Sequence, residues 1–472
     1  MKLYGYDVVN VTDDTRNVGS GSLFVAIRGD SFDGESVAGE MLRRGAVAVM
    51  CERDLGLSHQ IIVDNARVGF ALAASEFYGN PASKLKLIAV TGTNGKTTVA
   101  TLIKTILDKN GHKCGFIGTT CYDVCDSSGK VYESHLSTPR QDELYRLFAE
   151  MVENNAEYCV MEASSQALAQ FRITGEVFEV GIFTNLTQDH LDWHKSMENY
   201  FEAKKKLFGM CKSAIICTDD EYGIRLCEEV KNEMNVPVVS YGVNNSADIQ
   251  AVNIKTFESG ISYWLSDTRT EKSFPVKFKM PGMFNAVNSA AAVIACEVAG
   301  ITAQISIDSL RDCTGVRGRC EVVYSGDFTV IVDYAHTEDA LSKILTCVRG
   351  FAKKRIICVF GAAGERDSDK RPSMGKTAAE LADLLVITSD NPRFESPQKI
   401  IDEVVSGCGN CKNSTPFRTF TDRKKAIVFA LSEAKKEDVV LLAGKGHETY
   451  QVIGSEYQPF DERIIVREIL GI

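Results

Sequence analysis

Residues 91–98, Thr-Gly-Thr-Asn-Gly-Lys-Thr-Thr, have the residue types of a phosphate-binding loop. Glycines 92 and 95 would let backbone N–H groups wrap a polyphosphate, while Lys96 reaches its outer phosphates and the Thr97 hydroxyl holds Mg²⁺. The run is shorter than a Walker A loop, which has another glycine five positions before Gly95. A glycine-rich turn is the simpler reading. We nevertheless predict phosphate binding, because an apolar run precedes the loop and apolar residues at helical spacing follow it.

Three further side chains could reach a metal, although each has a simpler explanation. Glu162 follows the apolar run 158–161 at the end of an expected strand, but an acid before Ser164 and Ser165 also suits a solvated helix start. His190 and His194 stand four residues apart, which would place both on one face of a helix. Because Mg²⁺ prefers oxygen ligands, residue types alone leave the role of the histidines open.

The 15 cysteines are odd in number and scattered through the chain, which favours free thiols in a reducing cytoplasm over a disulfide framework. Cys408 and Cys411 form a CxxC pair, but no second pair stands at zinc-ribbon spacing. This pair also lies in a polar stretch, not at the start of a helix, so neither structural zinc nor a thioredoxin-like role is favoured.

Apolar runs alternate with helical segments three times along the chain, which predicts an α/β protein with three domains. The first ~80 residues indicate a small α/β domain, and residues 80–83 form a turn signal after it. A mainly parallel central sheet and a separate doubly wound C-terminal domain are expected to follow. We expect the strands of these domains at residues 23–27, 46–50, 61–63, 85–90, 158–161, 180–183, 214–217, 330–332, 355–360, 384–388 and 439–442.

Composition limits the functional class. The net charge of −10 argues against binding nucleic acid over the whole surface, although a local basic pocket is still allowed. The first ten residues contain no apolar signal segment, and no stretch approaches the ~18 apolar residues that span a bilayer. We therefore expect a cytoplasmic, monomeric enzyme that acts on small molecules, with no membrane span and no nucleic-acid partner.

Taken in order, the motifs of the chain resemble those of the Mur ligases, and the resemblance covers nearly its whole length. Any one motif could arise by chance, whereas the ordered set could not. The matching segments are residues 23–27, 33–34, 91–98, 137–139, 162–165, 184–194, 200–204, 285–288, 318–319, 333–336, 364–367, 390–393 and 444–448.

The resemblance implies three domains, at residues 1–83 for a UDP moiety, 84–318 for ATP and 319–472, Rossmann-like, for an incoming amino acid. It also implies a reaction in which a substrate carboxylate attacks the γ-phosphate of ATP. The acyl phosphate so formed would then react with the amine of the next amino acid. That chemistry depends mostly on positioning and on charge neutralisation by Lys96 and Mg²⁺.

The resemblance also implies roles for single residues. Glu162 and His190 would join Thr97 as Mg²⁺ ligands, and Lys204 would be the carbamylated lysine, with Lys205 one position away. Asn288, Arg319 and Asp333 would hold the adenine, phosphates and ribose, next to Gly92, Thr93, Asn94, Gly95, Lys96, Thr97 and Thr98. The muramoyl dipeptide would contact Ser137, Thr138, Ser164, Gln170 and Arg172, and the uridine site would begin at Thr15 and Arg16.

The last domain has polar segments after three expected strands, namely Arg366, the run Asp390, Asn391, Pro392 and Arg393, and the run from Gly444 to Glu448. Ligands of open α/β sheets bind beyond the carboxyl ends of strands, so these segments should meet in one crevice. Arg393 suits a carboxylate and Glu448 an ammonium, and meso-diaminopimelate has both groups at its distal end. A solvated turn is the simpler reading of the arginine motif.

Several alternatives remain open from the sequence. The stretch at residues 362–366, Ala-Ala-Gly-Glu-Arg, is reminiscent of relatives that add L-lysine, which lacks the distal carboxylate. A folylpolyglutamate-type synthetase would lack the first domain, and a kinase or plain NTPase would not need the C-terminal crevice. A nucleotide-binding regulatory protein would show no amino-acid-dependent release of ADP.

Overall fold

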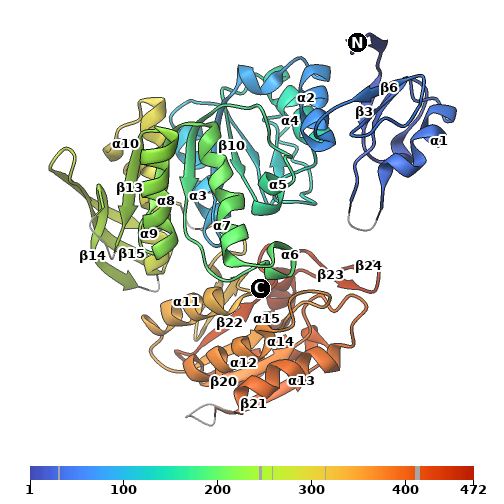
Figure 1. Cartoon of the computed structure of the whole chain (residues 1–472). Coiled ribbons are helices and arrows are strands. Elements are labelled where there is room, and N and C mark those ends of the chain that lie inside the picture. The colour runs from blue at the N-terminus through green and yellow to red at the C-terminus, as the bar shows by residue number, and fades with distance from the viewer. Residues whose placement is uncertain (30–31, 244–246, 258, 314, 410–414) are drawn as a thin grey trace.

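Three larger β-sheets, of four, ten and six strands, organise the chain, as the computed structural model shows (Figure 1). The structure describes residues 1–472 except 30–31, 244–246, 258, 314 and 410–414. The α/β class with three units is therefore confirmed. Among the described residues, no helix is both long and apolar enough to cross a bilayer.

The N-terminal sheet is small and parallel, with the strand order β3-β4-β5-β6. Two apolar clusters lie against this sheet. One includes Phe70 of helix α2, and the other includes Phe24 of strand β4. The elements of this unit are β1 (Lys2–Leu3), β2 (Tyr6–Asp7), β3 (Asn10–Thr12), β4 (Ser22–Val25), α1 (Ala38–Arg43), β5 (Ala48–Cys51), β6 (Gln60–Ile62) and α2 (Ala66–Phe77).

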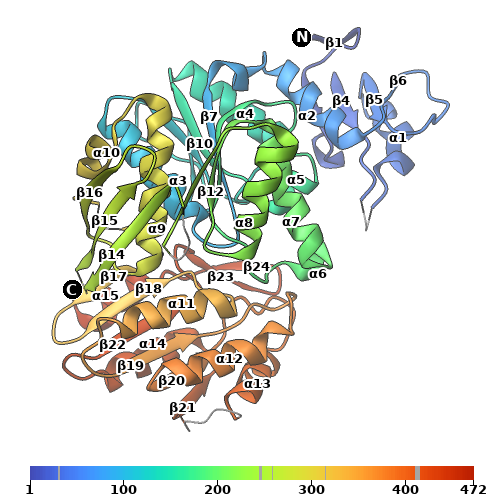
Figure 2. The ribbon, with the colours of Figure 1, turned by 60° about the vertical axis from the view of Figure 1, so that its left-hand side comes forward.

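The central sheet has ten strands in the order β16-β15-β14-β13-β12-β11-β7-β10-β8-β9. The predicted parallel strands form its middle, with β7 (Lys86–Thr91) between β10 (Tyr158–Glu162) and β11 (Phe178–Phe183). Its remaining strands are β8 (Cys114–Ile117), β9 (Tyr122–Asp123), β12 (Cys211–Cys217), β13 (Val238–Gly242), β14 (Ile249–Phe257), β15 (Gly260–Asp267) and β16 (Lys272–Phe278). Strands β14, β15 and β16 form antiparallel pairs on the side of the sheet away from the N-terminal unit (Figure 2). The sequence analysis did not predict these three strands.

Helices cover both faces of the central sheet, where two large apolar clusters lie. Helix α3 (Lys96–Lys109) buries Val99, Leu102, Ile103, Ile106 and Leu107, as their helical spacing predicts. The other helices of this unit are α4 (Gln141–Glu153), α5 (Ser165–Ala169), α6 (Leu191–His194), α7 (Met197–Lys205), α8 (Glu221–Glu229), α9 (Met283–Ala295) and α10 (Ala303–Leu310).

The C-terminal sheet has the order β17-β18-β22-β19-β20-β21 and is parallel except for β17. Its strands are β17 (Glu321–Ser325), β18 (Thr329–Asp333), β19 (Ile356–Phe360), β20 (Leu384–Thr388), β21 (Phe417–Phe420) and β22 (Val439–Ala443). Its helices are α11 (Glu338–Arg349), α12 (Lys370–Leu381), α13 (Pro397–Cys408), α14 (Arg423–Glu433) and α15 (Glu462–Leu470). The hairpin of β23 (Tyr450–Ile453) and β24 (Glu456–Pro459) lies beside this sheet.

The pairing of neighbouring strands places the predicted site segments at the ends of the strands. Thr91 pairs with Phe183, and Glu162 with Val90, so β7, β10 and β11 end at one edge of the central sheet. Asp333 pairs with Ala443, so β18 and β22 end together in the C-terminal sheet. Because parallel strands present their carboxyl ends to the same side, each sheet offers one edge to a ligand.

Candidate active site

The phosphate loop takes a shape that only glycine accepts at two positions. Gly92 and Gly95 have φ angles of 144° and 91°, in the region that other residues rarely adopt. A Cβ atom on Gly92 would lie 1.9 Å from Thr184 Oγ1, and one on Gly95 would lie 2.7 Å from Asn288 Oδ1. The loop therefore closes tightly against Asn288, which was predicted to lie next to it.

Two lysines converge on the carbonyl oxygen of Gly92. Lys96 Nζ donates to this oxygen and to that of Thr93, both at 2.9 Å, and Lys204 Nζ donates to it at 2.8 Å. Burial lowers the pKa of Lys96, and burial together with the charge of Lys96 holds the pKa of Lys204 well below its usual range. Lys204 also lies 4.4 Å above the ring of Tyr200. Lys205 instead points to Glu229 and Glu233, so Lys204 is the lysine that reaches the loop.

Glu162 ends strand β10, as predicted, and its carboxylate is fully buried beside the loop. The backbone N–H and the hydroxyl of Thr119 donate to its two oxygens at 2.7 and 2.9 Å. Thr119 Oγ1 is also 2.7 Å from Ser137 Oγ, so Ser137 lies next to the carboxylate. This pairing satisfies part of the buried charge and leaves acceptor capacity for a cation.

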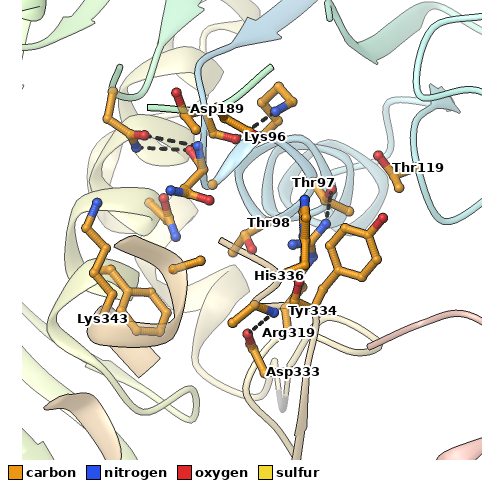
Figure 3. A pocket seen from close by; sticks show the side chains of 18 of the residues that line it. Lys96, Thr97, Thr98, Thr119, Asp189, Arg319, Asp333, Tyr334, His336 and Lys343 are labelled. Atoms are coloured by element: carbon orange, nitrogen blue, oxygen red, sulfur yellow. Dashed lines mark hydrogen bonds between the residues drawn. The ribbon is translucent and has the colours of Figure 1, made fainter. Parts of the chain in front are cut away.

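A cavity of about 250 Å³ lies between the phosphate loop and the C-terminal unit (Figure 3). Arg319 crosses it, with Nη2 donating to Thr97 Oγ1 at 3.1 Å and the guanidinium 4.5 Å above the ring of Tyr334. Its Nε is buried and has no hydrogen-bond partner among the described residues. An unpaired guanidinium nitrogen beside a phosphate loop is suited to an anionic ligand.

The cavity also contains the other predicted nucleotide residues. Asn288 and Asp333 line it together with Glu162 and His190. Asp333 accepts hydrogen bonds from the backbone N–H groups of Cys320 and Ala335 at 2.7 and 2.8 Å, while burial raises its pKa. One carboxylate thus fixes the segment that carries Arg319 against the end of β18.

The two histidines do not share a helical face, so that prediction was wrong. Helix α6 begins at Leu191, and His190 precedes it in the left-handed region with φ of 54°. His190 lines the cavity, whereas His194 is buried with Nε2 2.8 Å from Ser165 Oγ. Burial, with the nearby charge of Lys204, lowers the pKa of His194 to about 4. His194 is therefore a neutral core residue.

The donor set around the loop suits a hard cation. Thr97 and Glu162 offer oxygen atoms and His190 offers a ring nitrogen, all three on the wall of one cavity. Within the described residues, no group of three or more His, Cys, Asp or Glu side chains is arranged to hold a metal alone. A cation at this place would therefore share its coordination with phosphate oxygens and water, which is the usual manner of Mg²⁺.

A second cavity, of about 500 Å³, lies between the N-terminal unit and the central sheet. It brings together the predicted residues Thr15, Gln170 and Arg172. Arg172 donates to Gln170 Oε1 at 2.8 Å and to the carbonyl of Thr138 at 2.9 Å. The arginines that line this cavity are Arg16, Arg67, Arg140 and Arg172.

Thr138 and Ser164 connect the two cavities. Thr138 Oγ1 donates to the carbonyl of Glu162 at 2.8 Å and accepts from the N–H of Ser164 at 3.0 Å. Ser164 caps helix α5, its side chain accepting from the N–H of Ala167. The segment that holds Glu162 is thus continuous with the wall of the larger cavity.

The C-terminal crevice forms around a lysine that the sequence analysis missed. Lys445 is fully buried, and its Nζ donates to Glu448 Oε2 at 2.6 Å and to Asn391 Oδ1 at 2.9 Å, with Asp390 Oδ1 at 3.5 Å. Asn391 Nδ2 also donates to Glu448 Oε2 at 3.0 Å. The spacing of the motif does not show which side chains Lys445 contacts, but a lysine inside Gly-Lys-Gly-His-Glu was a visible signal.

Asn391 and Glu448 therefore meet as predicted, and Arg393 follows at the same edge. Pro392 precedes Arg393, whose backbone is left-handed with φ of 54° and pairs with Val452 and Gly454 of the hairpin segment. Arg393 Nε is buried and has no partner within the described chain. A Cβ on Gly444 would lie 2.8 Å from Asp390 Oδ2, which explains the glycine there.

Two other predictions fare differently. Arg366 is exposed, and no hydrogen bond or ion pair joins its side chain to the described residues, although the N–H of Gly364 in the same segment donates to the carbonyl of Asn391 at 2.9 Å. Cys408 ends α13, and Cys411 lies outside the described residues. The described cysteines other than Cys408 are free thiols.

Comparison with known proteins identifies the family. The Mur ligase middle domain matches residues 90–296, and the Mur ligase glutamate ligase domain matches residues 318–446. The chain belongs to the Mur ligase family. The first matched segment contains the phosphate loop, Lys96 and Lys204, and the second contains the ends of strands β18 and β22.

Curated Mur ligases match the chain over most of its length. It is 42% identical to UDP-N-acetylmuramoyl-L-alanyl-D-glutamate--2,6-diaminopimelate ligase 1 of Clostridium acetobutylicum, covering 98% of this chain and 95% of the relative. A ligase of the same name from Caldanaerobacter subterraneus is also 42% identical, with the same coverage. A solved structure of such a ligase superposes with a TM-score of 0.70 at 30% identity, covering 98% and 95% of the two chains.

Proposed function

We propose that this Mur ligase uses ATP to join meso-diaminopimelate to the D-Glu of UDP-N-acetylmuramoyl-L-Ala-D-Glu, in the synthesis of peptidoglycan precursors. One observation carries the proposal: residues of the phosphate loop and residues of the C-terminal unit line one cavity, so ATP bound there would contact both units. The names of the relatives, which include both the dipeptide and 2,6-diaminopimelate, support this choice of substrates.

In the first step, an oxygen of the D-Glu carboxylate attacks the γ-phosphorus of ATP, and ADP leaves. Lys96 and Arg319 would neutralise the charge that builds up on the phosphate oxygens, because Lys96 belongs to the loop and Arg319 donates to Thr97 of it. In the second step, the amine of the acceptor attacks the acyl phosphate, phosphate leaves and the amine loses a proton. Holding the two substrates in a reacting geometry would supply much of the rate enhancement.

Thr97, Glu162 and His190 would hold Mg²⁺ beside the phosphates. The ion would neutralise phosphate charge and orient the γ-phosphate. Asn288 and Asp333 would bind the adenine and the ribose, and the backbone of residues 92–98 would wrap the phosphates.

Lys204 would be modified to a carbamate. Only the neutral amine reacts with CO₂, and the lowered pKa of Lys204 makes that form available. The product is an anion, which would replace a costly buried ammonium beside Lys96 with an opposite charge.

The larger cavity would receive the UDP-linked dipeptide. Thr15, Arg16, Gln170 and Arg172 would contact its anionic and amide groups, while Ser137, Thr138 and Ser164 lead from there to Glu162. The domain limits at residues 83/84 and 318/319 are part of this proposal, since they separate the three binding regions.

The acceptor would bind in the crevice of the C-terminal sheet. Arg393 would pair with the distal carboxylate, while Asn391 and Glu448 receive the ammonium, with Asp390, Pro392 and Gly444 shaping the backbone around them. L-Lysine would leave Arg393 without a partner. Arg366 would need to move to reach this site.

The proposal is tested by mass-spectrometric detection of the tripeptide product and by assay of phosphate release. The purified protein should form product only when ATP, Mg²⁺, the UDP-linked dipeptide and the acceptor are all present. Lys96→Ala should abolish ligation while the circular dichroism spectrum stays unchanged. Lys109→Ala, at the exposed far end of the same helix, is the matched control and should retain full turnover. Turnover by Lys96→Ala at the wild-type rate would refute the assignment of the loop.

A further inference from the structure

A single carboxylate oxygen links the C-terminal sheet unit to both loops of the nucleotide cavity. Asp339 lies in the first turn of α11, and its Oδ2 accepts from Asn94 Nδ2 at 2.8 Å and from Thr187 Oγ1 at 3.2 Å. Lys343, one turn later, donates to the same oxygen at 2.8 Å. Asp339 itself does not line the cavity, whereas Asn94 and Lys343 do.

Asn94 is held on three sides. Its backbone N–H donates to Asn185 Oδ1 at 3.0 Å, and its carbonyl accepts from Thr184 Oγ1 at 2.6 Å and Asn185 Nδ2 at 3.0 Å. These contacts come from the central unit and fix the backbone. Asp339 supplies the side-chain contact from the opposite unit, so it determines where the amide of Asn94 points.

Thr187 extends the same connection to the second loop. Its backbone N–H donates to Thr93 Oγ1 at 3.0 Å, and Asp189 and His190 follow it two and three residues later. The loop with Lys96 and the loop with His190 therefore meet at one oxygen of Asp339.

Stability of the helix alone does not require this geometry. An acid in the first turn and a lysine four residues later already favour α11, by roughly a few tenths of a kcal/mol. Neither effect depends on Asn94 or Thr187. The two contacts across the units are hydrogen bonds to a charged acceptor, which are stronger than those between neutral groups.

We propose that Asp339 is a positioning residue for nucleotide binding: it orients Asn94 and Thr187 so that the phosphate loop is complete only when the C-terminal unit is docked. This inference rests on the proposed function, because it assigns the cavity to ATP. Binding of nucleotide and docking of the C-terminal unit favour each other, since coupling between two sites is reciprocal.

Steady-state kinetics and ADP titration calorimetry on the full-length protein test the inference. Asp339→Ala should raise the KM for ATP and the Kd for ADP about 10-fold, as expected for loss of a charged hydrogen bond. The kcat at saturating ATP and the KM for the UDP-linked dipeptide should stay within about 2-fold. Asp339→Glu, which keeps the charge, should recover part of the affinity. Glu338→Ala, the neighbouring acid on α11, is the matched control and should leave ADP binding unchanged.

A double-mutant cycle separates positioning from simple adhesion between the units. Asp339→Ala should weaken ADP binding less in the Asn94→Ala background than in the wild type, because Thr187 is then the remaining loop partner that Asp339 positions. Independent, multiplicative losses in the double variant would overturn the proposal, as would unchanged ADP affinity in Asp339→Ala. If the wild-type protein fails to bind ADP, the proposed function fails instead, which keeps the two outcomes distinct.

Discussion

Lys445 Nζ lies 2.6 Å from Glu448 Oε2, and the lysine side chain has no exposed surface. Asp390 Oδ1 lies 3.5 Å from the same nitrogen, so two carboxylates share one buried ammonium. Burial raises the pKa of Glu448, while the charge of Lys445 opposes that change. Under the proposed function, the cluster would hold a carboxylate in place for a second ammonium, the one that an amino-acid acceptor brings.

Lys445→Met should disable the acceptor site selectively. Removing one partner of a buried ion pair leaves the other uncompensated, so we expect the KM for meso-diaminopimelate to rise about 100-fold. The KM for ATP should change less than about 2-fold, since the nucleotide cavity is lined by other residues. Lys424→Met, an exposed lysine on α14, serves as the control. Equal rises in both KM values would contradict a specific role.

Lys204 should be found as a carbamate in the active enzyme. Nuclear magnetic resonance with isotopically labelled bicarbonate should show one carbamate signal that Lys204→Gln lacks and Lys205→Gln keeps. Activity of Lys204→Gln should fall by orders of magnitude, and added short carboxylic acids should restore part of it by occupying the vacated space. A carbamate signal that survives in Lys204→Gln would move the modification to another lysine.

His194 should make the protein sensitive to acid. Its pKa is about 4 in the folded state, against about 6.5 when unfolded, so the unfolded chain binds more protons below pH 6.5. The stabilisation is therefore complete at neutral pH and is lost as the pH falls from about 6.5 to 4. In protein whose Lys204 is unmodified, this one group should lower the free energy of unfolding by about 2 kcal/mol between pH 7 and pH 5.

Urea denaturation of wild type and His194→Gln at both pH values measures this effect. The loss of stability between pH 7 and pH 5 should be smaller in the variant, whatever its stability at pH 7. An equal loss in both proteins would show that other groups cause the acid sensitivity.

Much of the fold follows from local patterns in the sequence. The apolar runs 85–90 and 158–161 became β7 and β10, and the polar residues after them, from Gly92 and at Glu162, reached one edge because parallel strands end together. The same reasoning placed Asn391 and Glu448 side by side. The strands β14, β15 and β16 escaped prediction because their half-exposed, alternating faces lack a continuous apolar run.

The parts of the site that could not be predicted depend on contacts between distant segments. Lys445 meets Asn391 across 54 residues, and Asp339 meets Asn94 across 245. No spacing rule connects such pairs, because tertiary packing decides them. The prediction that His190 and His194 share a helical face was wrong for a local reason. The backbone of His190 is left-handed, so the helix begins one residue later, at Leu191.

The most direct test of the account compares acceptors in the phosphate-release assay with ATP, Mg²⁺ and UDP-N-acetylmuramoyl-L-Ala-D-Glu. Meso-diaminopimelate should support turnover, and L-lysine should be slower by several orders of magnitude, because it leaves Arg393 unpaired. Arg393→Ala should reduce kcat/KM for meso-diaminopimelate toward the value for lysine, with the KM for the UDP-linked dipeptide unchanged. Equal turnover of both acceptors by the wild-type protein would contradict the assigned role of Arg393, and no acceptor-dependent release would contradict ligation itself.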